Sequence, residues 1–206
     1  MRRGDRLSSE RELASRFDVS RQTVREALVA LEVAGIVEIR LGSGVYVRST
    51  TVTEAHPGYE DEPGPLEILE ARKSFEGEAA ALAAERIGNE ELQQLQSRLR
   101  LMREAAEKGD TEQTEDHDRR FHLAIAEASR NSAVHSTVDR LWRLRSKSEI
   151  SRSFHERARK QASIPNISDH ERILRALVRR DPDAARDAMR KHIGRVYDEF
   201  SRFSLA

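Results

Sequence analysis

The stretch DVSRQTVREALVALEVAGIVEIRLGSGVYV, from Asp18 to Val47, decides the fold of the N-terminal part of the chain. Ser20 is suited to cap a helix that runs to Ala34, because its hydroxyl can accept a hydrogen bond from a free backbone N–H group. Gly35 is expected to end that helix in a left-handed conformation. A shorter helix over residues 9–17 precedes it. Two helices joined by a short turn predict a helix–turn–helix unit.

Two strand-like segments follow the second helix. IVEIR (36–40) and VYVRS (45–49) alternate apolar and polar residues, which is typical of strands with one buried face. Between them lies Leu41-Gly42-Ser43-Gly44, whose glycines permit a tight turn close to a DNA backbone. Residues 1–48 are therefore predicted to form a winged helix–turn–helix domain.

The second helix is expected to present different residues to the core and to DNA. The residues predicted to face the core are Val24, Ala27, Leu28 and Leu31. Arg21, Gln22 and Arg25 fall on the opposite face, near the end that enters the major groove in such motifs, and are expected to be exposed. Arginine suits guanine edges and glutamine suits adenine. The hydroxyls of Ser20 and Thr23 suit phosphate oxygens. On composition alone, a small α+β domain with solvated arginines remains an equal alternative.

The overall composition favours a cytoplasmic protein of amphipathic helices. The 36 basic residues balance the 36 acidic ones, and over a third of the chain is charged. Residues 1–50 carry nine arginines against seven acidic residues, so their net charge is only mildly basic. The positions of the arginines therefore matter more for DNA binding than this net charge. The absence of cysteine excludes disulfides and thiolate metal sites. No apolar run reaches the roughly 18 residues that a membrane span needs, so no membrane partner is expected.

The rest of the chain divides into a linker and a helical domain. Residues 49–64 hold Pro, Gly, Thr and acids without periodicity, which indicates a linker. From residue 65 to 206 we expect an antiparallel all-helical bundle, because short connections reverse successive helices. Its helices are predicted at 65–87, 90–108, 111–130, 132–160, 167–180 and 182–203. The first helix should bury Leu66, Leu69, Phe75, Ala79, Leu82 and Ile87. The fold class is thus mainly α with a small β wing.

One aspartate and three histidines are candidates for a metal site in the helical domain. Asp118 and His122 are four residues apart and share a helix face. His170 and His192 lie on two later helices, each close to apolar positions. If they converge, these groups would bind one divalent transition metal and leave positions open for a ligand. Zinc is the first expectation, with nickel and manganese open. Spacing alone favours the plainer alternative of hydrogen-bonded histidines in a polar core.

The N-terminal residues resemble a known family of DNA-binding domains. The stretch LSSERELASRFDVSRQTVREALVALEVAGIVEIRLGSGVYV closely resembles the DNA-binding domain of GntR-family bacterial transcription regulators. The resemblance implies that Arg11, Arg21 and Arg25 contact bases and phosphates and that Gly42 is the wing tip. The family's winged domain usually begins with a further helix, so we expect the recorded start of the chain to be late or truncated.

The helical part resembles the effector domain of the FadR (FCD) branch of the same family. The resemblance lies in EARKSFEGEAAALAAERI, DRRFHLAIAEASRN and DHERILRALVRRDPDAARDAMRKHI. It implies that an Asp and three His bind a metal in this order, here Asp118, His122, His170 and His192. It also implies that Arg72 faces the same cavity and pairs with the carboxylate of an effector, while the metal takes a second oxygen. For Arg145, a cavity-facing and a solvated position both remain open.

These features predict a ligand-responsive bacterial transcription regulator. A homodimer would bind a pseudo-palindromic double-stranded operator and sense a small carboxylate or sugar acid. The alternative is a metal-dependent enzyme in which the Asp and three His activate water. Two observations argue against an enzyme. No nucleophile or general base occurs at the spacing of a catalytic motif, and an enzymatic function would leave the winged motif unexplained. A third possibility is a DNA-binding protein whose polar pocket is only structural.

Overall fold

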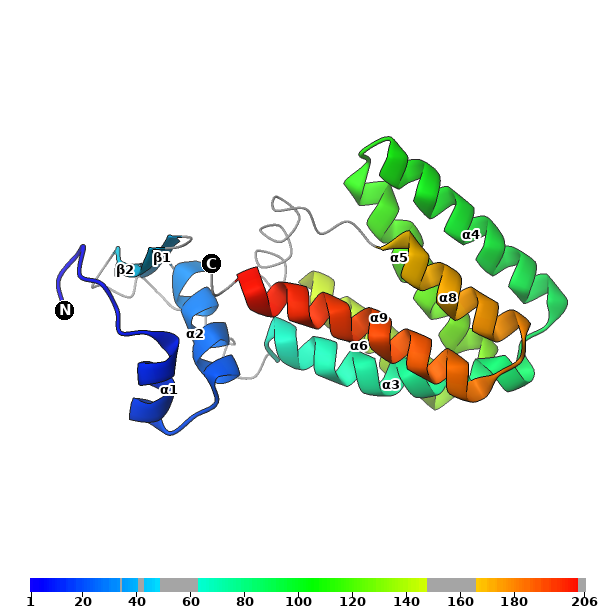
Figure 1. The fold of residues 1–206 in the computed structure, drawn as a ribbon, viewed down its shortest axis with the longest axis horizontal. Helices are drawn as coiled ribbons and strands as arrows, with labels where there is room; N and C mark the ends of the chain where they lie inside the picture. The colour runs from blue at the N-terminus through cyan, green and yellow to red at the C-terminus, as the bar shows by residue number, and fades with distance from the viewer. Residues whose placement is uncertain (34, 41–42, 49–62, 148–165, 204–206) are drawn as a thin grey trace.

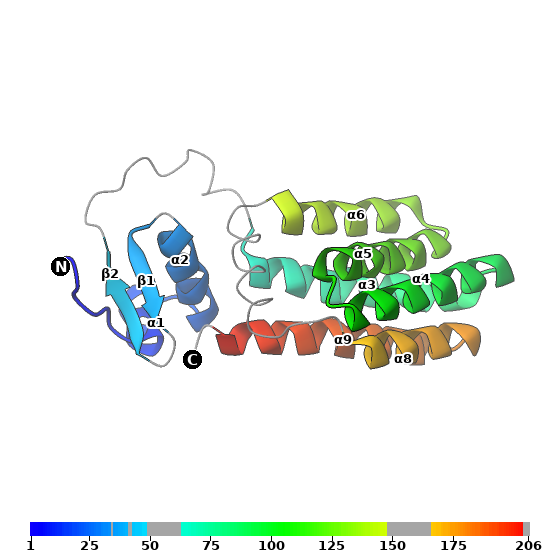
Figure 2. The same ribbon diagram turned by 90° about the horizontal axis from the view of Figure 1, so that it is seen from above.

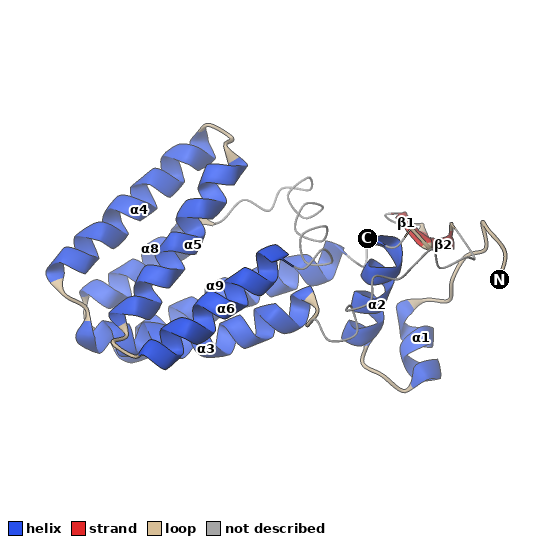
Figure 3. Ribbon diagram, turned by 180° about the vertical axis from the view of Figure 1, so that it is seen from behind, coloured by secondary structure: helices blue, strands red, loops and turns tan. Residues whose placement is uncertain are grey.

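The computed structural model describes residues 1–33, 35–40, 43–48, 63–147 and 166–203. A winged domain lies at one end of the elongated molecule, and a helical domain makes up the rest (Figure 1). Strands occur only in the wing within these ranges, so the chain is mainly α, as the sequence predicts (Figure 3). No helix in the described part of the chain is both long and apolar enough to span a membrane.

The helix–turn–helix unit consists of α1 (Glu10–Phe17) and α2 (Arg21–Val33). A capping box formed by Ser9 and Glu12 begins α1, and Asp18 ends it in a left-handed conformation. Ser20 begins α2, since its hydroxyl accepts a hydrogen bond of 3.0 Å from the N–H of Thr23. The two helices and their turn are therefore confirmed, with bounds within one residue of those predicted.

The wing is a two-stranded antiparallel sheet of β1 (Val37–Arg40) and β2 (Gly44–Val47). Gly44 pairs with Arg40 and has φ of 115°, a conformation that favours glycine. The expected tip at Leu41 and Gly42 lies outside the described residues. The sequence did not predict that Arg6 forms an antiparallel bridge with Tyr46 of β2, next to which the N–H of Leu7 donates to the carbonyl of Val45.

The winged domain has a small apolar core. Ala14, Val24 and Leu28 are buried together, and Leu7, Leu13, Ile39 and Val45 pack around them. The prediction for Ala27 is wrong, because this residue is exposed. Val29, on another face of α2, is instead buried and belongs to the core of the helical domain. The second helix therefore packs on two sides, against its own domain and against the helical domain.

The helical domain contains six described helices. They are α3 (Pro65–Arg86), α4 (Asn89–Glu107), α5 (Thr111–Ala128), α6 (Ser132–Lys147), α8 (Ile167–Val178) and α9 (Pro182–Phe203). Seen from above, α6, the pair α3 and α5, and the pair α8 and α9 lie in successive layers (Figure 2). Most bounds agree with the prediction to within about two residues. The predicted helical segment 148–160 and most of the predicted linker lie outside the described residues.

Helix α3 occupies the centre of this domain and contacts α5, α6, α8 and α9. Alanines at positions 79, 80, 81, 83 and 84 are buried along it and let the neighbouring helices approach closely. The prediction for Phe75 is wrong, because its side chain is 45% exposed. Glu76, the next residue, is buried instead. A buried glutamate requires partners, and it points to the functional site.

Candidate functional site

The four candidate ligands converge inside the helical domain. Asp118 and His122 come from α5, His170 from α8 and His192 from α9. One ligand atom from each lies within 4.8 Å of the others, and all four residues are buried. The ring of Phe121 packs edge-on against His170, with 5.2 Å between ring centroids, and closes one side of the cluster. The predicted convergence of these residues on one point is thus seen in the fold.

An oxygen outside the cluster lies near Nδ1 of each histidine. Nδ1 of His122 bonds to Glu76, and Nδ1 of His170 lies 3.0 Å from the carbonyl of Asn166. Nδ1 of His192 lies 3.6 Å from Oδ2 of Asp169. Such outer oxygens fix the ring tautomer and leave Nε2 available as a metal ligand. A hydrogen bond thus holds Nδ1 of His122 and of His170 outward, whereas Nδ1 of His192 has Asp169 as a neighbour at 3.6 Å but no hydrogen bond within the described residues.

The inward atoms suit a divalent transition metal. Nε2 of His170 lies 2.7 Å from Oδ1 of Asp118. Nε2 of His122 lies 3.5 Å from the same oxygen and, among the described residues, has no hydrogen-bond partner although it is buried. A buried nitrogen without a good partner is costly, and a cation at this point would satisfy it. Three imidazoles and one carboxylate, without a thiolate, match the preferences of zinc, nickel or manganese.

The pKa values of these groups reflect burial opposed by close charges. Burial alone would raise the pKa of Glu76, but the charges of Arg72 and His122 outweigh it and lower the pKa to about 2. Burial would lower the pKa of His122, yet Glu76 and Asp118 raise it to about 8. For His192, burial and the nearby His170 lower the pKa to about 3. The two carboxylates thus favour the protonated form of His122 when no metal is bound.

Arg72 lies directly beside this cluster. Its Nε donates a hydrogen bond of 2.6 Å to Oε1 of Glu76, and both side chains are buried. Its guanidinium carbon lies 3.8 Å from the ring centroid of Trp142 on α6. Sequence reasoning named Arg72 but missed Glu76. The four-residue spacing of this Arg–Glu pair within EARKSFE was the available signal, because residues at that spacing share a helix face.

Arg145 faces the cluster rather than solvent. Only 16% of its side chain is exposed, and its Nη1 lies 3.9 Å from Oδ2 of Asp118. Its guanidinium carbon lies 4.9 Å from the ring centroid of Trp142. Of the two positions that the sequence left open for Arg145, the solvated one is not seen, because this side chain lies beside the cluster.

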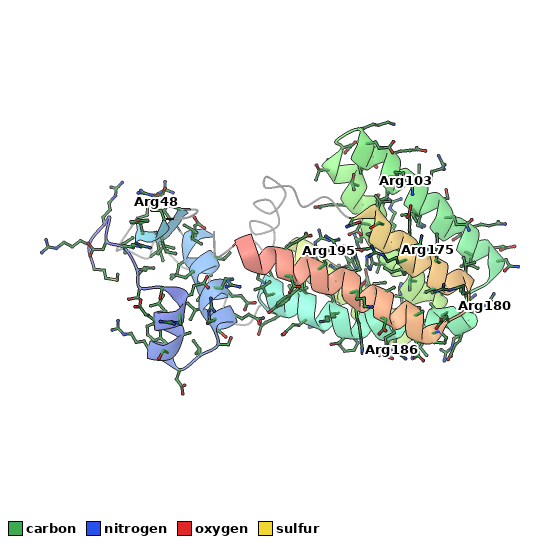
Figure 4. The ribbon with its side chains drawn as sticks, viewed as in Figure 1. Arg48, Arg103, Arg175, Arg180, Arg186 and Arg195 are labelled. Atoms are coloured by element: carbon green, nitrogen blue, oxygen red, sulfur yellow. The ribbon has the colours of Figure 1, made fainter. Side chains whose placement is uncertain are left out.

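Asp169 is a second acidic residue that sequence reasoning missed. Its Oδ2 accepts a hydrogen bond of 2.6 Å from Nε of Arg195 and faces His192. Arg195 lies between α9 and α8 (Figure 4). These contacts, and the charge of Arg195, hold the pKa of Asp169 well below its usual range, with the bond to His192 as the largest cause. Asp169 precedes His170 in the sequence, but its orientation toward α9 depends on packing between helices.

The expected DNA contacts are only partly on the surface. Arg11, Arg21, Ser20 and Thr23 are exposed, as predicted. The expectation that Arg25 is exposed is wrong, because only 9% of its side chain is accessible.

A buried ion pair explains the position of Arg25. Its Nε and Nη2 donate to the two carboxylate oxygens of Glu10, at 3.2 and 2.9 Å. In this structure the pair ties α1 to α2. Gly42 lies outside the described residues.

Besides the apolar contact of Val29, two polar residues of α2 form hydrogen bonds with the helical domain. The hydroxyl of Tyr197 on α9 donates a hydrogen bond of 2.8 Å to Oε1 of Gln22. One turn further along α2, Oε1 of Glu26 accepts a hydrogen bond of 3.2 Å from the backbone N–H of Glu67 in α3. Burial, together with the negative charge of Glu67, raises the pKa of Glu26. The start of α2 therefore packs against the start of α3 and the end of α9, which lie side by side (Figures 1 and 2).

A winged helix–turn–helix domain joined to a helical domain with a buried cluster of one aspartate and three histidines is typical of DNA-binding transcription regulators with a sensor domain. Residues 1–47 match the family described as "Bacterial regulatory proteins, gntR family", and residues 67–195 match the FCD domain. The chain belongs to the GntR family and carries the FCD effector-binding domain. Both resemblances seen in the sequence are thereby confirmed.

Proteins similar to this chain are also transcription regulators. The Exu regulon transcriptional regulator of Escherichia coli K12 is 34% identical over 194 residues, covering 92% of this chain and 74% of that protein. The Uxu operon transcriptional regulator of the same strain is 33% identical over 206 residues, covering 98% and 80%. A solved structure of Streptococcus agalactiae GntR is 29% identical, with a TM-score of 0.55, and covers 96% of this chain and 91% of that one. These relatives are regulators and not enzymes, so the chain is a regulator and the enzyme alternative is rejected.

Proposed function

We propose that this regulator senses a small organic acid through a divalent metal held by Asp118, His122, His170 and His192. The observation that carries the proposal is the set of four buried ligand atoms within 4.8 Å of one another. The oxygens bonded to Nδ1 of His122 and of His170 support it, because metal-ligating histidines almost always donate their other N–H to such a group. When bound, the metal would supply a Lewis-acidic position for a carboxylate oxygen of the effector.

Arg72 would hold the carboxylate of the effector. Its guanidinium lies beside the cluster and bonds to Glu76 through Nε, and a guanidinium can donate to a carboxylate from two nitrogens. The burial of the site strengthens such a pair. A small carboxylate or sugar acid is therefore the proposed class of effector.

The protein is proposed to act on DNA as a homodimer in the bacterial cytoplasm. Arg11, Arg21 and Thr23 are exposed on or beside the helix that would enter the major groove. Two copies related by a two-fold axis would read two half-sites related in the same way, so the operator should be pseudo-palindromic. Footprinting should then show two equivalent protected half-sites, and one asymmetric contact region would contradict a dimer.

The acid is proposed to act on DNA binding through α3. This helix carries Arg72 and Glu76 at the site, and its first turn holds Glu26 of the recognition helix. A shift of α3 on acid binding would change how the winged domain is held. A coupling free energy of about 1–3 kcal/mol would give a useful switch.

The proposal is tested by elemental analysis and a thermal-shift screen on untagged protein. We expect about one metal ion per chain, and a carboxylic or sugar acid that raises the melting temperature of the metal-loaded form. His170→Ala should lose the metal, whereas His117→Ala should keep it, because His117 is a histidine of α5 outside the cluster. Wild-type protein that binds no added zinc, nickel or manganese would contradict the proposal.

A further inference from the structure

The fold makes the exposed surface of the winged domain more basic than its sequence. Eight of the nine arginines in residues 1–48 are exposed, but only four of the seven acidic residues are. Glu10 pairs with the buried Arg25. Glu26 and Glu32 accept hydrogen bonds from backbone N–H groups of α3 and β1. The exposed charge of this domain therefore favours a polyanionic partner.

The wing has an inner face and an outer face. Val45 packs against the core of the winged domain, and Val47 is buried. Successive side chains of a strand point to opposite faces, so Gly44 and Tyr46 of β2 lie on the outer face. A partner that binds the wing from outside would meet the side chains that gather on this outer face.

Two arginines flank β2 on the outer face. Arg40 of β1 is paired with Gly44, and residues paired across antiparallel strands share a face. On the other side of β2, Arg6 forms an antiparallel bridge with Tyr46 and therefore lies on the same face. This other side of β2 points away from the helical domain (Figure 2). The helical domain therefore leaves this edge of the wing uncovered.

The guanidinium groups of both arginines lie over β2. A Cβ atom at Gly44 would lie 2.7 Å from Nε and 3.1 Å from Nη2 of Arg6, which is too close. Only glycine therefore leaves room for this guanidinium against the backbone of the wing. From the other side, the guanidinium carbon of Arg40 lies 4.6 Å from the ring centroid of Tyr46. The two cations thus lie at positions 44 and 46, which are separated by roughly 7 Å along a strand.

The charges of these two arginines are available to a partner. Arg40 pairs with Glu38 at 3.1 Å, but their side chains are 55% and 48% exposed, and an ion pair so open to water is weak. Within the described ranges, no acidic side chain lies at ion-pair distance from Arg6. A guanidinium presents a fork of N–H donors that matches two oxygens of a phosphate. Phosphate groups are therefore suitable ligands for both side chains.

From these contacts we infer that Arg6 and Arg40 form a phosphate-binding surface on the outer face of the wing, and that Gly44 is a positioning residue for Arg6. The partner is the backbone of double-stranded DNA, because the exposed arginines of this domain outnumber its exposed acidic residues. Such contacts add affinity that does not depend on base sequence, and they fix the orientation of the domain on the duplex. The inference rests on the DNA binding of the proposed function and is independent of the metal site.

The salt dependence of DNA binding tests this surface without knowledge of the operator. A guanidinium bound to a phosphate displaces a counterion, so losing one contact should reduce the slope of log affinity against log salt by about 0.9 per bound chain. Arg6→Gln and Arg40→Gln should each show this reduction on a labelled duplex of mixed sequence. Their affinity should fall roughly eight-fold at about 0.1 M salt. Fluorescence anisotropy at several salt concentrations measures the slope and the affinity.

Two further measurements separate a phosphate contact from a structural role. Since a phosphate contact carries no sequence information, the loss should be equal on two duplexes of unrelated sequence. Arg6→Lys keeps the positive charge and should retain the slope of wild type. Arg100→Gln, at an exposed position on α4, is the control for the loss of one arginine and should also keep this slope.

The role of Gly44 is tested together with Arg6. Gly44→Ala should displace the guanidinium of Arg6 and reduce the salt slope. The φ of 115° at this position also strains alanine, so thermal unfolding must first show that the variant is folded at the temperature of the titration. In an Arg6→Gln background, Gly44→Ala should reduce the slope no further, because both changes remove the same contact. Additive reductions would refute the positioning role.

The outcomes separate the inference from the proposed function. Wild-type slopes in Arg6→Gln and Arg40→Gln would refute the phosphate-binding surface, and so would a loss confined to one of the two duplexes. A change of oligomeric state in these variants, measured by sedimentation velocity, would also refute it and would make the outer face a contact between copies of this chain. Wild-type protein that binds neither duplex at low salt would contradict the proposed DNA binding itself.

Discussion

Tyr197 and Gln22 are 175 residues apart in the sequence, and a hydrogen bond of 2.8 Å joins them. It links the last part of α9 to the first turn of the helix expected to read DNA. Gln22 is one of the residues expected to contact bases, and this bond holds its side chain against α9 instead. Glu26, one turn along the same face, holds the first turn of α3. Under the proposed function, the helical domain and the operator would therefore compete for one face of α2.

Removing the hydroxyl of Tyr197 should increase the affinity for operator DNA. Tyr197→Phe keeps the ring and loses one hydrogen bond, worth about 0.5–1.5 kcal/mol, so the affinity of acid-free protein should rise roughly 2- to 10-fold. Fluorescence anisotropy with a labelled operator measures this change. An affinity equal to that of wild type would show that the contact does not oppose DNA binding.

Arg21 and Arg25 should respond differently to alanine substitution. Arg21→Ala removes an exposed base contact and should weaken operator binding by about 1–3 kcal/mol at an unchanged melting temperature. Arg25→Ala also leaves Glu10 without its buried partner, so it should destabilise the winged domain by about 1–3 kcal/mol.

Both variants would be followed by anisotropy and by thermal unfolding. Arg100→Ala, at an exposed position on α4, provides the control and should change neither property. Full operator affinity in Arg21→Ala would refute the DNA-reading role, and an unaltered melting curve in Arg25→Ala would refute the structural one.

Glu76 should strengthen metal binding without being a ligand. Its carboxylate orients His122 through Nδ1, and loss of such an outer partner typically costs 10- to 100-fold in metal affinity. Glu76→Gln, which keeps the size of the side chain, should therefore weaken zinc binding by about that factor. Glu78→Gln, on the exposed side of α3, should leave zinc binding unchanged, although this variant loses a surface ion pair with Arg186 (Figure 4). Equal zinc affinity in the two variants would exclude the orienting role.

Metal affinity should fall with decreasing pH below about 8. The pKa of His122 is raised to about 8 in the metal-free protein, so below that pH a proton must leave the ring before a metal can bind. This competition should weaken binding about ten-fold per pH unit, and it should vanish above about pH 8. His192 should not contribute in this range, because its pKa is lowered to about 3. Chelator competition at several pH values measures how steeply the metal affinity depends on pH. A metal affinity that stays constant from about pH 6 to 8 would contradict the predicted competition.

Local physical signals predicted most helices, whereas the metal-site prediction for the four clustered residues came from the family resemblance, because spacing alone favoured a polar core. Asp118 and His122 share a helix face by their spacing alone, and His170 and His192 lie near apolar positions that had to pack inward. The capping residue Ser20 and the glycine-rich wing turn are local signals, so their elements were confirmed within one or two residues.

The errors concern contacts between elements. Arg25 carries the pattern of an exposed arginine, but Glu10 of the preceding helix is positioned to bury it. Phe75 carries the pattern of a core residue, but the rotation of α3 buries Glu76 instead. Gln22 faces α9, which follows it by more than 150 residues. The periodicity of a single helix carries no information on how that helix is rotated against its neighbours. The burial of these residues could therefore be seen only in the three-dimensional structure.

The central claim is that the acid controls DNA binding through the metal site. The direct test is the operator affinity of metal-loaded and metal-stripped protein, each with and without the acid that raises the melting temperature most. We predict that the acid changes the affinity of metal-loaded protein by about 5- to 150-fold and leaves the metal-stripped protein and His170→Ala unchanged. Metal-stripped wild type that responds fully to the acid would contradict the account and leave Asp118, His122, His170 and His192 as a polar core.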